Sequence, residues 1–151
     1  MVAFGVLPML YFGGVEMFKK EASKIRHKKR AKQIIDFKGL IDGKMMPTDI
    51  DAVIEYKNKA YVFIEVKHIE AKLPFGQKLA LERLVKDTEK AGKKSIAFVV
   101  VHETKADEDV DLGECNIRRY FFEGQWVFPE TNINIRDAVN KFLKPFRSDT
   151  K

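Results

Sequence analysis

Residues 48–67 read Thr-Asp-Ile-Asp-Ala-Val-Ile-Glu-Tyr-Lys-Asn-Lys-Ala-Tyr-Val-Phe-Ile-Glu-Val-Lys. The apolar alternation predicts two β-strands joined by a turn at 57–59. It sends the even-numbered residues of the second strand to one face and the odd-numbered residues to the other. Both faces are apolar as far as Phe63, which is typical of a central, covered strand. An unpaired charge in such a strand costs several kcal/mol, so Glu65 and Lys67 near its end indicate a function.

Asp51 and Glu65 place two carboxylates on adjacent strands. Such a pair can hold a hard divalent ion, Mg²⁺ or Mn²⁺ as its substitute, and leave positions for water and a phosphate oxygen. Lys67 points to the same side as Glu65 and can orient that water or balance charge in the transition state. We therefore expect a metal-dependent phosphodiester-cleaving site. The structural alternative is a salt bridge between Lys67 and the carboxylates.

The spacing Glu-x-Lys alone is weak evidence, because the chain contains it at 55/57, 65/67, 70/72 and 103/105. The pairs that begin at Glu70 and Glu103 fall in or beside expected loops, and Glu55 is next to the expected turn. Only Glu65 and Lys67 lie on a strand that is apolar on both sides and follows a strand that carries an acid. This context favours Glu65 and Lys67 as the functional pair.

The 151 residues, 45% of them hydrophobic, suit one domain spanning 1–151. The single cysteine, Cys115, excludes an internal disulfide framework and a multi-cysteine zinc site, so we expect a cytoplasmic protein of a prokaryotic, archaeal or phage type. The apolar segment 2–12 is shorter than the roughly 20 residues that span a bilayer. It favours a core strand or a dimer contact over a targeting signal, and we expect no membrane partner.

The net charge of +6 is concentrated in residues 19–32, which hold eight basic residues and one acid. Apolar residues recur with helical spacing from 15 to 32, which predicts an amphipathic helix with a basic outer face. Such a block is typical of proteins that bind a phosphate backbone, although a solvated face that only aids solubility is the alternative. The histidines show no metal-ligand spacing, and Trp126 is more typical of a hairpin core than of a base-stacking platform.

The remaining pattern predicts an α/β fold with a mixed central sheet flanked by helices. The expected elements are a strand at 33–37, the hairpin above, a helix at 76–92, a strand at 95–101, strands at 118–122 and 125–128, and a helix at 135–143. Glu123-Gly124 is the turn signal between the last two strands. The helix at 76–92 should connect parallel strands.

The hairpin motifs and this element order resemble the PD-(D/E)xK nuclease superfamily, whose restriction-endonuclease-like core is a helix, a three-strand meander, a helix and a strand. The resemblance covers about 15–101, and residues 115–145 would be an added C-terminal hairpin and helix. It implies that Asp51, Glu65 and the main-chain carbonyl of Val66 bind the metal and that Lys67 is the catalytic lysine. Asp49 competes with Asp51 for the first position and is otherwise a supporting residue.

Two further catalytic residues are implied by the resemblance. Glu16, in Gly14-Val15-Glu16, is similar to the first-helix glutamate of archaeal-type Holliday junction resolvases, with Glu21 as the alternative. Gln77 matches the helix glutamine of exonuclease-like members, but Leu81 replaces the tyrosine that follows it there. A helix-capping or surface role for Gln77 therefore stays open.

These observations predict a Mg²⁺-dependent DNA nuclease that is structure-directed or weakly sequence-specific. DNA would contact the basic helix and the segment 70–78, through Lys20, Lys24, His27, Lys28, Lys72 and Lys78. The alternatives are a nucleic-acid-binding module without turnover, a Holliday junction resolvase-like homodimer, and an assembly protein that binds a partner through its apolar beginning.

Overall fold

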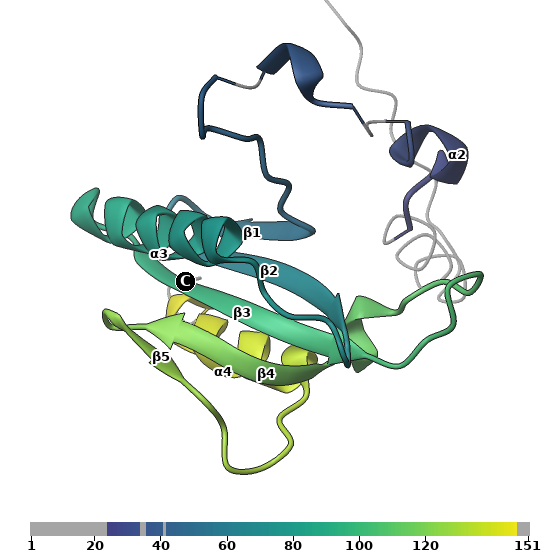
Figure 1. Cartoon of the computed structure of the whole chain (residues 1–151). Coiled ribbons are helices and arrows are strands. Elements are labelled where there is room, and N and C mark those ends of the chain that lie inside the picture. The colour runs from purple at the N-terminus through teal and green to yellow at the C-terminus, as the bar shows by residue number, and fades with distance from the viewer. Residues whose placement is uncertain (1–23, 34–35, 41, 148–151) are drawn as a thin grey trace, which may run out of the picture. The chain divides into compact units, whose positions relative to one another are not determined.

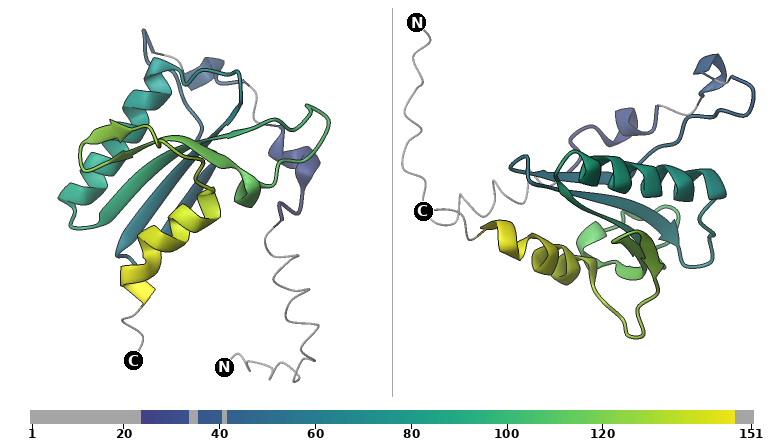
Figure 2. Two further views of the ribbon diagram at one scale, coloured as in Figure 1. Left: turned by 90° about the horizontal axis from the view of Figure 1, so that it is seen from below. Right: turned by 90° about the vertical axis from the view of Figure 1, so that its left-hand side faces the viewer.

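The computed structural model describes residues 24–33, 36–40 and 42–147, and the chain divides into two units, Met1–Pro47 and Thr48–Lys151. The second unit contains a mixed sheet of five strands in the order β1-β2-β3-β4-β5. The strands are β1 (Ala52–Tyr56), β2 (Ala60–His68), β3 (Lys94–His102), β4 (Asn116–Phe122) and β5 (Gln125–Val127). Helices α3 (Phe75–Lys90) and α4 (Ile135–Arg147) cover opposite faces of this sheet (Figures 1 and 2). The predicted α/β class with a mixed sheet is confirmed.

Strand β2 lies in the interior of the sheet, with a neighbouring strand on each side, as predicted. It pairs antiparallel with β1 and parallel with β3, to which α3 connects it. The even-numbered residues Val62 and Ile64 belong to the core under α4, whereas Phe63 belongs to the core under α3. The face to which β2 turns Glu65 is therefore the face that α3 covers.

Both hairpins turn through residues with positive φ. Three residues, 57–59, connect the paired Tyr56 and Ala60, whereas two residues, Glu123 and Gly124, connect the paired Phe122 and Gln125. Lys57 and Asn58 have φ of 50° and 55° between β1 and β2, and Glu123 and Gly124 have φ of 49° and 80° between β4 and β5. The Glu55 carboxylate accepts a hydrogen bond from the Asn58 amide. Both predicted hairpins are confirmed.

Strand β4 contains a β-bulge at Arg118. Its neighbour β3 pairs Val99 with Arg119 but Val100 with Ile117, so Arg118 is an extra residue in the ladder. Ile117 consequently packs in the core under α4, while Phe121 packs in the core under α3. Without the bulge the alternation would place both on one face.

Helix α3 lies within about two residues of the predicted range 76–92. Leu81 and Val85 are buried against the sheet. Near its C-terminal end, Thr88 Oγ1 lies 2.6 Å from the hydroxyl oxygen of Ser95, a fully buried residue at the start of β3. Gly92, with φ of 84°, follows the helix as its expected stop.

Two predicted elements in the first unit differ from the structure. In the range 33–37, the described residues Gln33, Asp36 and Phe37 lie in no strand, so the third meander strand is not seen there. Of the helix expected at 15–32, residues 15–23 lie outside the described residues, and the described part is helical only over α2 (Lys28–Ala31). Ile25, expected on its buried stripe, is 68% exposed. A short helix without a buried face is marginal in water, which explains the difference.

The last helix extends past its predicted end at residue 143 to Arg147 and contains Pro145. Its apolar stripe explains the extension, because Phe142 and Phe146 pack against the core under α4. The described part of the first unit also contains a 3-10 turn at Lys38–Leu40 and the expected turn at Asp42-Gly43, closed by a bridge between Asp42 and Met45. Along the described ranges, every helix is too short or too polar to cross a bilayer.

Candidate active site

Glu65 and Lys67 form a buried ion pair on the α3 side of β2. Glu65 is only 3% exposed, and its Oε1 lies 2.7 Å from Lys67 Nζ. The Lys67 side chain is 17% exposed, so it reaches toward solvent from the same face. Glu65 and Lys67 are two residues apart on the strand, so their side chains lie on the same face and can meet.

Asp51 lies directly before β1, opposite the same part of β2. The pairing of Ala52 with Ile64 brings Asp51 alongside Glu65 and Val66. Asp51 Oδ2 accepts a hydrogen bond of 2.7 Å from the Val66 amide. A strand residue directs its N–H and C=O to the same side, so the Val66 carbonyl is also directed toward Asp51.

Burial raises the pKa of Glu65 above its ordinary value of 4.5. The hydrogen bond and positive charge of Lys67 oppose this rise, whereas the nearby Asp51 and Asp49 carboxylates add to it. Negative charge is thus concentrated around one buried carboxyl group. A cation bound among these groups would stabilise the ionised form.

Gln77 and Asp49 lie beside this group. Gln77 is in the first turns of α3, and its Nε2 donates a long hydrogen bond of 3.4 Å to Asp49 Oδ1. The Gln77 Oε1 is buried and has no hydrogen-bond partner among the described residues. Asp51 contacts the strand of Glu65 while Asp49 contacts the helix, so the two competing acids occupy different positions.

The other Glu-x-Lys pairs have different surroundings. Glu55 accepts the turn hydrogen bond from Asn58 and is exposed, and Glu70 and Glu103 are exposed outside the core. Of the four glutamates in these pairs, only Glu65 is buried. This agrees with its predicted place on a strand that is apolar on both faces.

The predicted nucleic-acid contacts and first-helix glutamates are distributed over both units of the chain and the residues outside the described ranges. Glu16, Glu21 and Lys20 lie outside the described residues. Lys24, His27 and Lys28 are exposed in the unit Met1–Pro47. In the second unit, Lys72 is exposed in the loop after β2, and Lys78 on α3 lies 3.5 Å from Glu82.

Two arginines near the site were not singled out from the sequence. Arg118 donates hydrogen bonds to the carbonyl oxygens of Ala71, at 2.5 Å, and Ile69, and so ties β4 to the loop that follows Lys67. Arg119 lies on the α3 side of the sheet, with its guanidinium over the Trp126 ring. The sequence feature that could have indicated them is the pair Arg118-Arg119 within an otherwise apolar strand.

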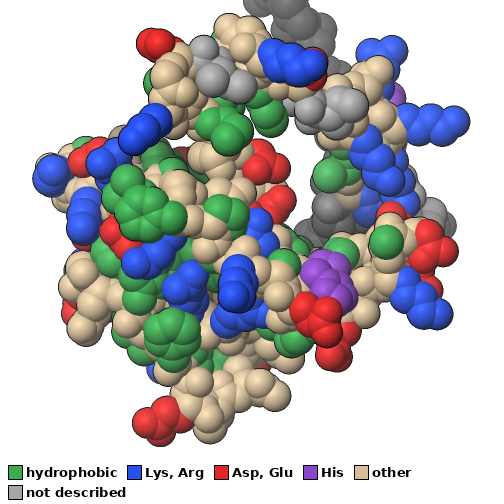
Figure 3. All heavy atoms as spheres, viewed as in Figure 1, with side chains coloured by type: hydrophobic (Ala, Val, Ile, Leu, Met, Phe, Trp, Pro, Cys, Tyr) green, Lys and Arg blue, Asp and Glu red, His purple; other side chains and the backbone are tan. Residues whose placement is uncertain are grey.

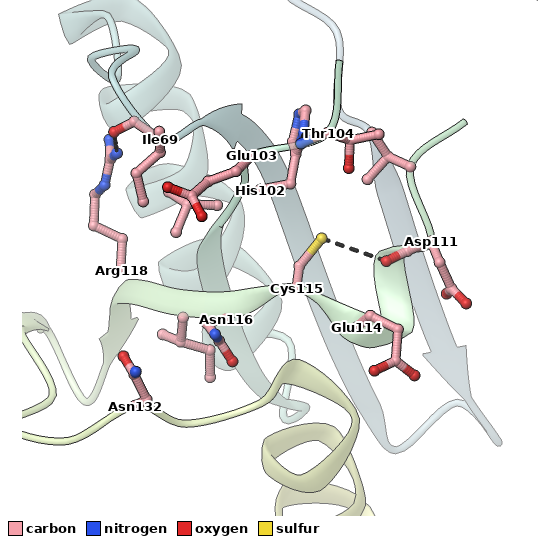
Figure 4. A pocket seen from close by; sticks show the side chains of 13 residues that line it. Ile69, His102, Glu103, Thr104, Asp111, Glu114, Cys115, Asn116, Arg118 and Asn132 are labelled. Atoms are coloured by element: carbon pink, nitrogen blue, oxygen red, sulfur yellow. Dashed lines mark hydrogen bonds between the residues drawn. The ribbon is translucent and has the colours of Figure 1, made fainter. Parts of the chain in front are cut away.

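A separate hollow adjoins the end of β3 (Figure 4), and none of Asp51, Glu65, Lys67 and Gln77 lines it. The buried thiol of Cys115 lies in it, 3.5 Å from the Asp111 carbonyl oxygen. Burial raises the pKa of this thiol, and the Asp111 and Glu114 carboxylates raise it further. A thiol held protonated is a poor nucleophile, so the hollow does not present a reactive cysteine.

No protein-family model, curated protein or solved structure matches the chain. Within residues 24–33, 36–40 and 42–147, no three His, Cys, Asp or Glu side chains are grouped so that they could hold a metal ion. A metal ion at the candidate site would therefore be bound by at most two such side chains of the described residues, and other groups would have to supply its remaining ligands.

Proposed function

We propose that the chain is a Mg²⁺-dependent nuclease that hydrolyses phosphodiester bonds in DNA, with a restriction-endonuclease-like core. The observation that carries the proposal is the convergence of Asp51, buried Glu65 and Lys67 at one end of a covered strand. An ordinary core gains nothing from concentrating carboxylates around a group whose pKa burial already raises.

The donor set fits a magnesium ion. Asp51 and Glu65 supply carboxylate oxygens, and the Val66 carbonyl is directed to the same side. Mg²⁺ prefers oxygen ligands and keeps several waters, so two carboxylates and a carbonyl are enough, with Mn²⁺ as a substitute. When bound, the ion polarises the phosphate and lowers the pKa of a coordinated water.

The remaining work falls to the chain's own side chains. Lys67 would move from its ion pair with Glu65 to orient the attacking water or to neutralise charge on the phosphate oxygens. Gln77, whose Oε1 has no partner in the described part of the chain, would accept a hydrogen bond from that water. Asp49 would hold Gln77 in place through the bond to its amide.

The test is cleavage of plasmid, single-stranded and four-way-junction DNA with Mg²⁺ and with EDTA. Lys67→Ala should lower the rate about a hundredfold or more, the usual effect of removing one charge-stabilising donor. Lys105→Ala is the matched control, because Lys105 has the same spacing from a glutamate but is exposed in a loop. Equal rates for wild type and Lys67→Ala would refute the catalytic assignment.

The Glu65–Lys67 ion pair also supports a second candidate, a nucleic-acid-binding module without turnover. In that case DNA binding would depend steeply on salt but not on Mg²⁺, and no substrate would be cut. A resolvase-like homodimer would cut four-way junctions preferentially and elute as a dimer. The apolar segment proposed as a partner contact lies outside the described residues.

A further inference from the structure

Arg119 shares a row of the sheet with Glu65. The register pairs Glu65 with Val99 on β3 and Val99 with Arg119 on β4. Neighbouring strands lie about 4.8 Å apart, so the backbones of Glu65 and Arg119 are separated by about 10 Å. Arg119 contacts Trp126, which packs on the core under α3, so it lies on the same face as Glu65.

The Arg119 guanidinium is held by aromatic rings. Its carbon Cζ lies 4.8 Å from the centre of the Trp126 ring and 5.7 Å from that of Phe128. In the described part of the chain, its Nε is buried without a hydrogen-bond partner, and no carboxylate forms an ion pair with it. The charge of Arg119 is therefore fixed in place but not neutralised by a direct contact.

The two rings differ in their exposure. Trp126 is held, because its Nε1 donates a 2.6 Å hydrogen bond to Glu82 on α3 and its ring lies 5.4 Å from that of Phe121. Phe128, just after β5, is 63% exposed. Trp126 thus belongs to the hairpin core, as predicted. It supports the Arg119 guanidinium, which lies beside the solvent-exposed ring of Phe128.

The surface around Arg119 and Phe128 carries both basic and apolar side chains. Lys78 and Lys86 on α3 flank this region, with Lys86 Nζ 5.5 Å from the Phe121 ring centre. Figure 3 shows Lys and Arg side chains interspersed with hydrophobic ones over α3 and the β4–β5 hairpin. Single-stranded nucleic acid is bound by this combination, since bases stack on aromatic rings and phosphates meet cations. A duplex hides its base faces and cannot use an exposed phenylalanine in this way.

We propose that Arg119 and Phe128, supported by Trp126, form a stacking platform for a single-stranded DNA segment that leads to the Asp51–Glu65 site. The inference rests on the proposed nuclease function for its substrate class. It adds to that function a preference for DNA with an unpaired strand next to the cleaved bond.

Binding is measured in EDTA, so that cleavage plays no part. The probes are a fluorescein-labelled oligothymidylate of about 12 nucleotides, within the usual range of single-strand site sizes, and a duplex of equal length. Emission of Trp126, the one tryptophan of the chain, gives a second signal. The variants are Phe128→Ala, Arg119→Ala and Arg119→Lys, which keeps the charge but not the planar stacking group.

Lys57→Gln is the matched control. Lys57 also lies over an aromatic ring, 5.4 Å from the centre of Tyr56, but at the far end of the β1–β2 hairpin from Glu65. It removes one positive charge, as Arg119→Ala does, without touching the platform.

Phe128→Ala and Arg119→Ala should weaken oligothymidylate binding roughly five- to a hundredfold, the usual effect of losing one stacked base. Arg119→Lys should fall between Arg119→Ala and wild type, Lys57→Gln should bind like wild type, and duplex affinity should change less than single-strand affinity. Wild-type binding by Phe128→Ala, or equal losses for both probes, would overturn the platform. Phe128 is exposed, so this variant is decisive even if Arg119→Ala fails to fold.

The two proposals fail separately. Loss of single-strand binding in Phe128→Ala in EDTA, together with no cleavage of any DNA by wild type, would refute the nuclease and leave the platform standing. Cleavage that depends on Lys67 but is accompanied by unchanged binding in Phe128→Ala would refute the platform alone.

Discussion

Glu65 is the residue on which the functional argument depends. It is buried at the end of a covered strand, yet a lysine and two acids lie close enough to its carboxyl group to change its pKa. Groups with a raised pKa and specific charged neighbours are common at catalytic sites. Burying such a charged group lowers the stability of the fold, and the loss can be measured as a free energy of unfolding.

Glu65→Gln should remove a pH-dependent loss of stability. The folded state raises the pKa of Glu65, so the folded protein binds the proton more tightly than the unfolded chain does. Wild-type stability should therefore fall, relative to the variant, as pH rises from about 4.5 through the raised pKa, and level off above it. Urea unfolding of both proteins across this pH range gives the difference. A difference that does not vary with pH would contradict the burial of the charge.

Lys67→Met should destabilise the fold in a pH-dependent way. It leaves the Glu65 carboxylate without its 2.7 Å partner, and breaking a buried pair costs about 3–5 kcal/mol. The cost should be smaller at lower pH, where Glu65, whose pKa is raised, can take up a proton instead. The free energy of unfolding at two pH values measures this. The double variant with Glu65→Gln should lose most of the pH dependence.

Alternation along the strand was enough to predict that Glu65 and Lys67 lie together on one face. Glu65 and Lys67 share a face because they are two residues apart, and the hairpin turn sets the register that brings Asp51 beside them. Arg119 could not be predicted in the same way. The bulge at Arg118 changes which face Arg119 occupies relative to Ile117, and no residue pattern in β4 marks it.

At the scale of elements, the turn glycine of the β4–β5 hairpin has a specific role. Gly124→Ala should cost about 1 kcal/mol, because an alanine is strained at a φ of 80°. Gly76→Ala is the matched variant: Gly76 lies in α3 and an added Cβ meets no atom within 4 Å. It should stabilise the fold by about 0.5–1 kcal/mol through helix propensity. Changes of opposite sign in the stability measured by thermal unfolding would confirm both predictions, and changes of the same sign would contradict one of them.

Thr88 links α3 to β3 through a buried hydroxyl pair. Its Oγ1 lies 2.6 Å from Ser95 Oγ and 2.7 Å from the Leu84 carbonyl oxygen. Thr88→Val leaves the buried Ser95 hydroxyl without this partner and should cost about 1–3 kcal/mol. The double variant with Ser95→Ala should cost less than the sum of the single variants. Additive costs in urea unfolding would show that the two hydroxyls do not act as a pair.

Elements with a buried face were predictable, and those without one were not. Strand β3 and helix α3 have continuous or periodic apolar patterns and were predicted within about two residues at each end. The strand expected at 33–37 rested on a short apolar run, and the described residues around Ile34 and Ile35 show no strand. Short runs do not distinguish a strand from irregular chain, because tertiary contacts decide between them.

At the scale of the whole molecule, the +6 charge should dominate the affinity for DNA and its dependence on salt. Lys24→Gln and Lys28→Gln should each reduce the slope of log affinity against log salt concentration by about 0.9 if each lysine contacts a phosphate. Lys141→Gln on α4, on the sheet face opposite the site, is the control and should leave the slope unchanged. Equal slopes for all proteins would show that the basic segment does not contact DNA.

The parallel pairing of β2 and β3 followed from the order of elements. A helix between two apolar strands predicts a parallel pair, and β2 and β3 form one. The position of β4 beside β3 depends on long-range pairing, which local patterns do not encode.

The Thr88–Ser95 contact has a mechanical consequence for α3. It fastens the C-terminal end of the helix to the sheet through a buried bond, whereas the first turns are linked to Asp49 by one long bond of 3.4 Å. We expect a helix held in this way to tilt about its C-terminal end, so that the amplitude of motion grows toward Gln77. Under the proposed nuclease function, such a tilt of α3 would give a DNA strand access to Gln77.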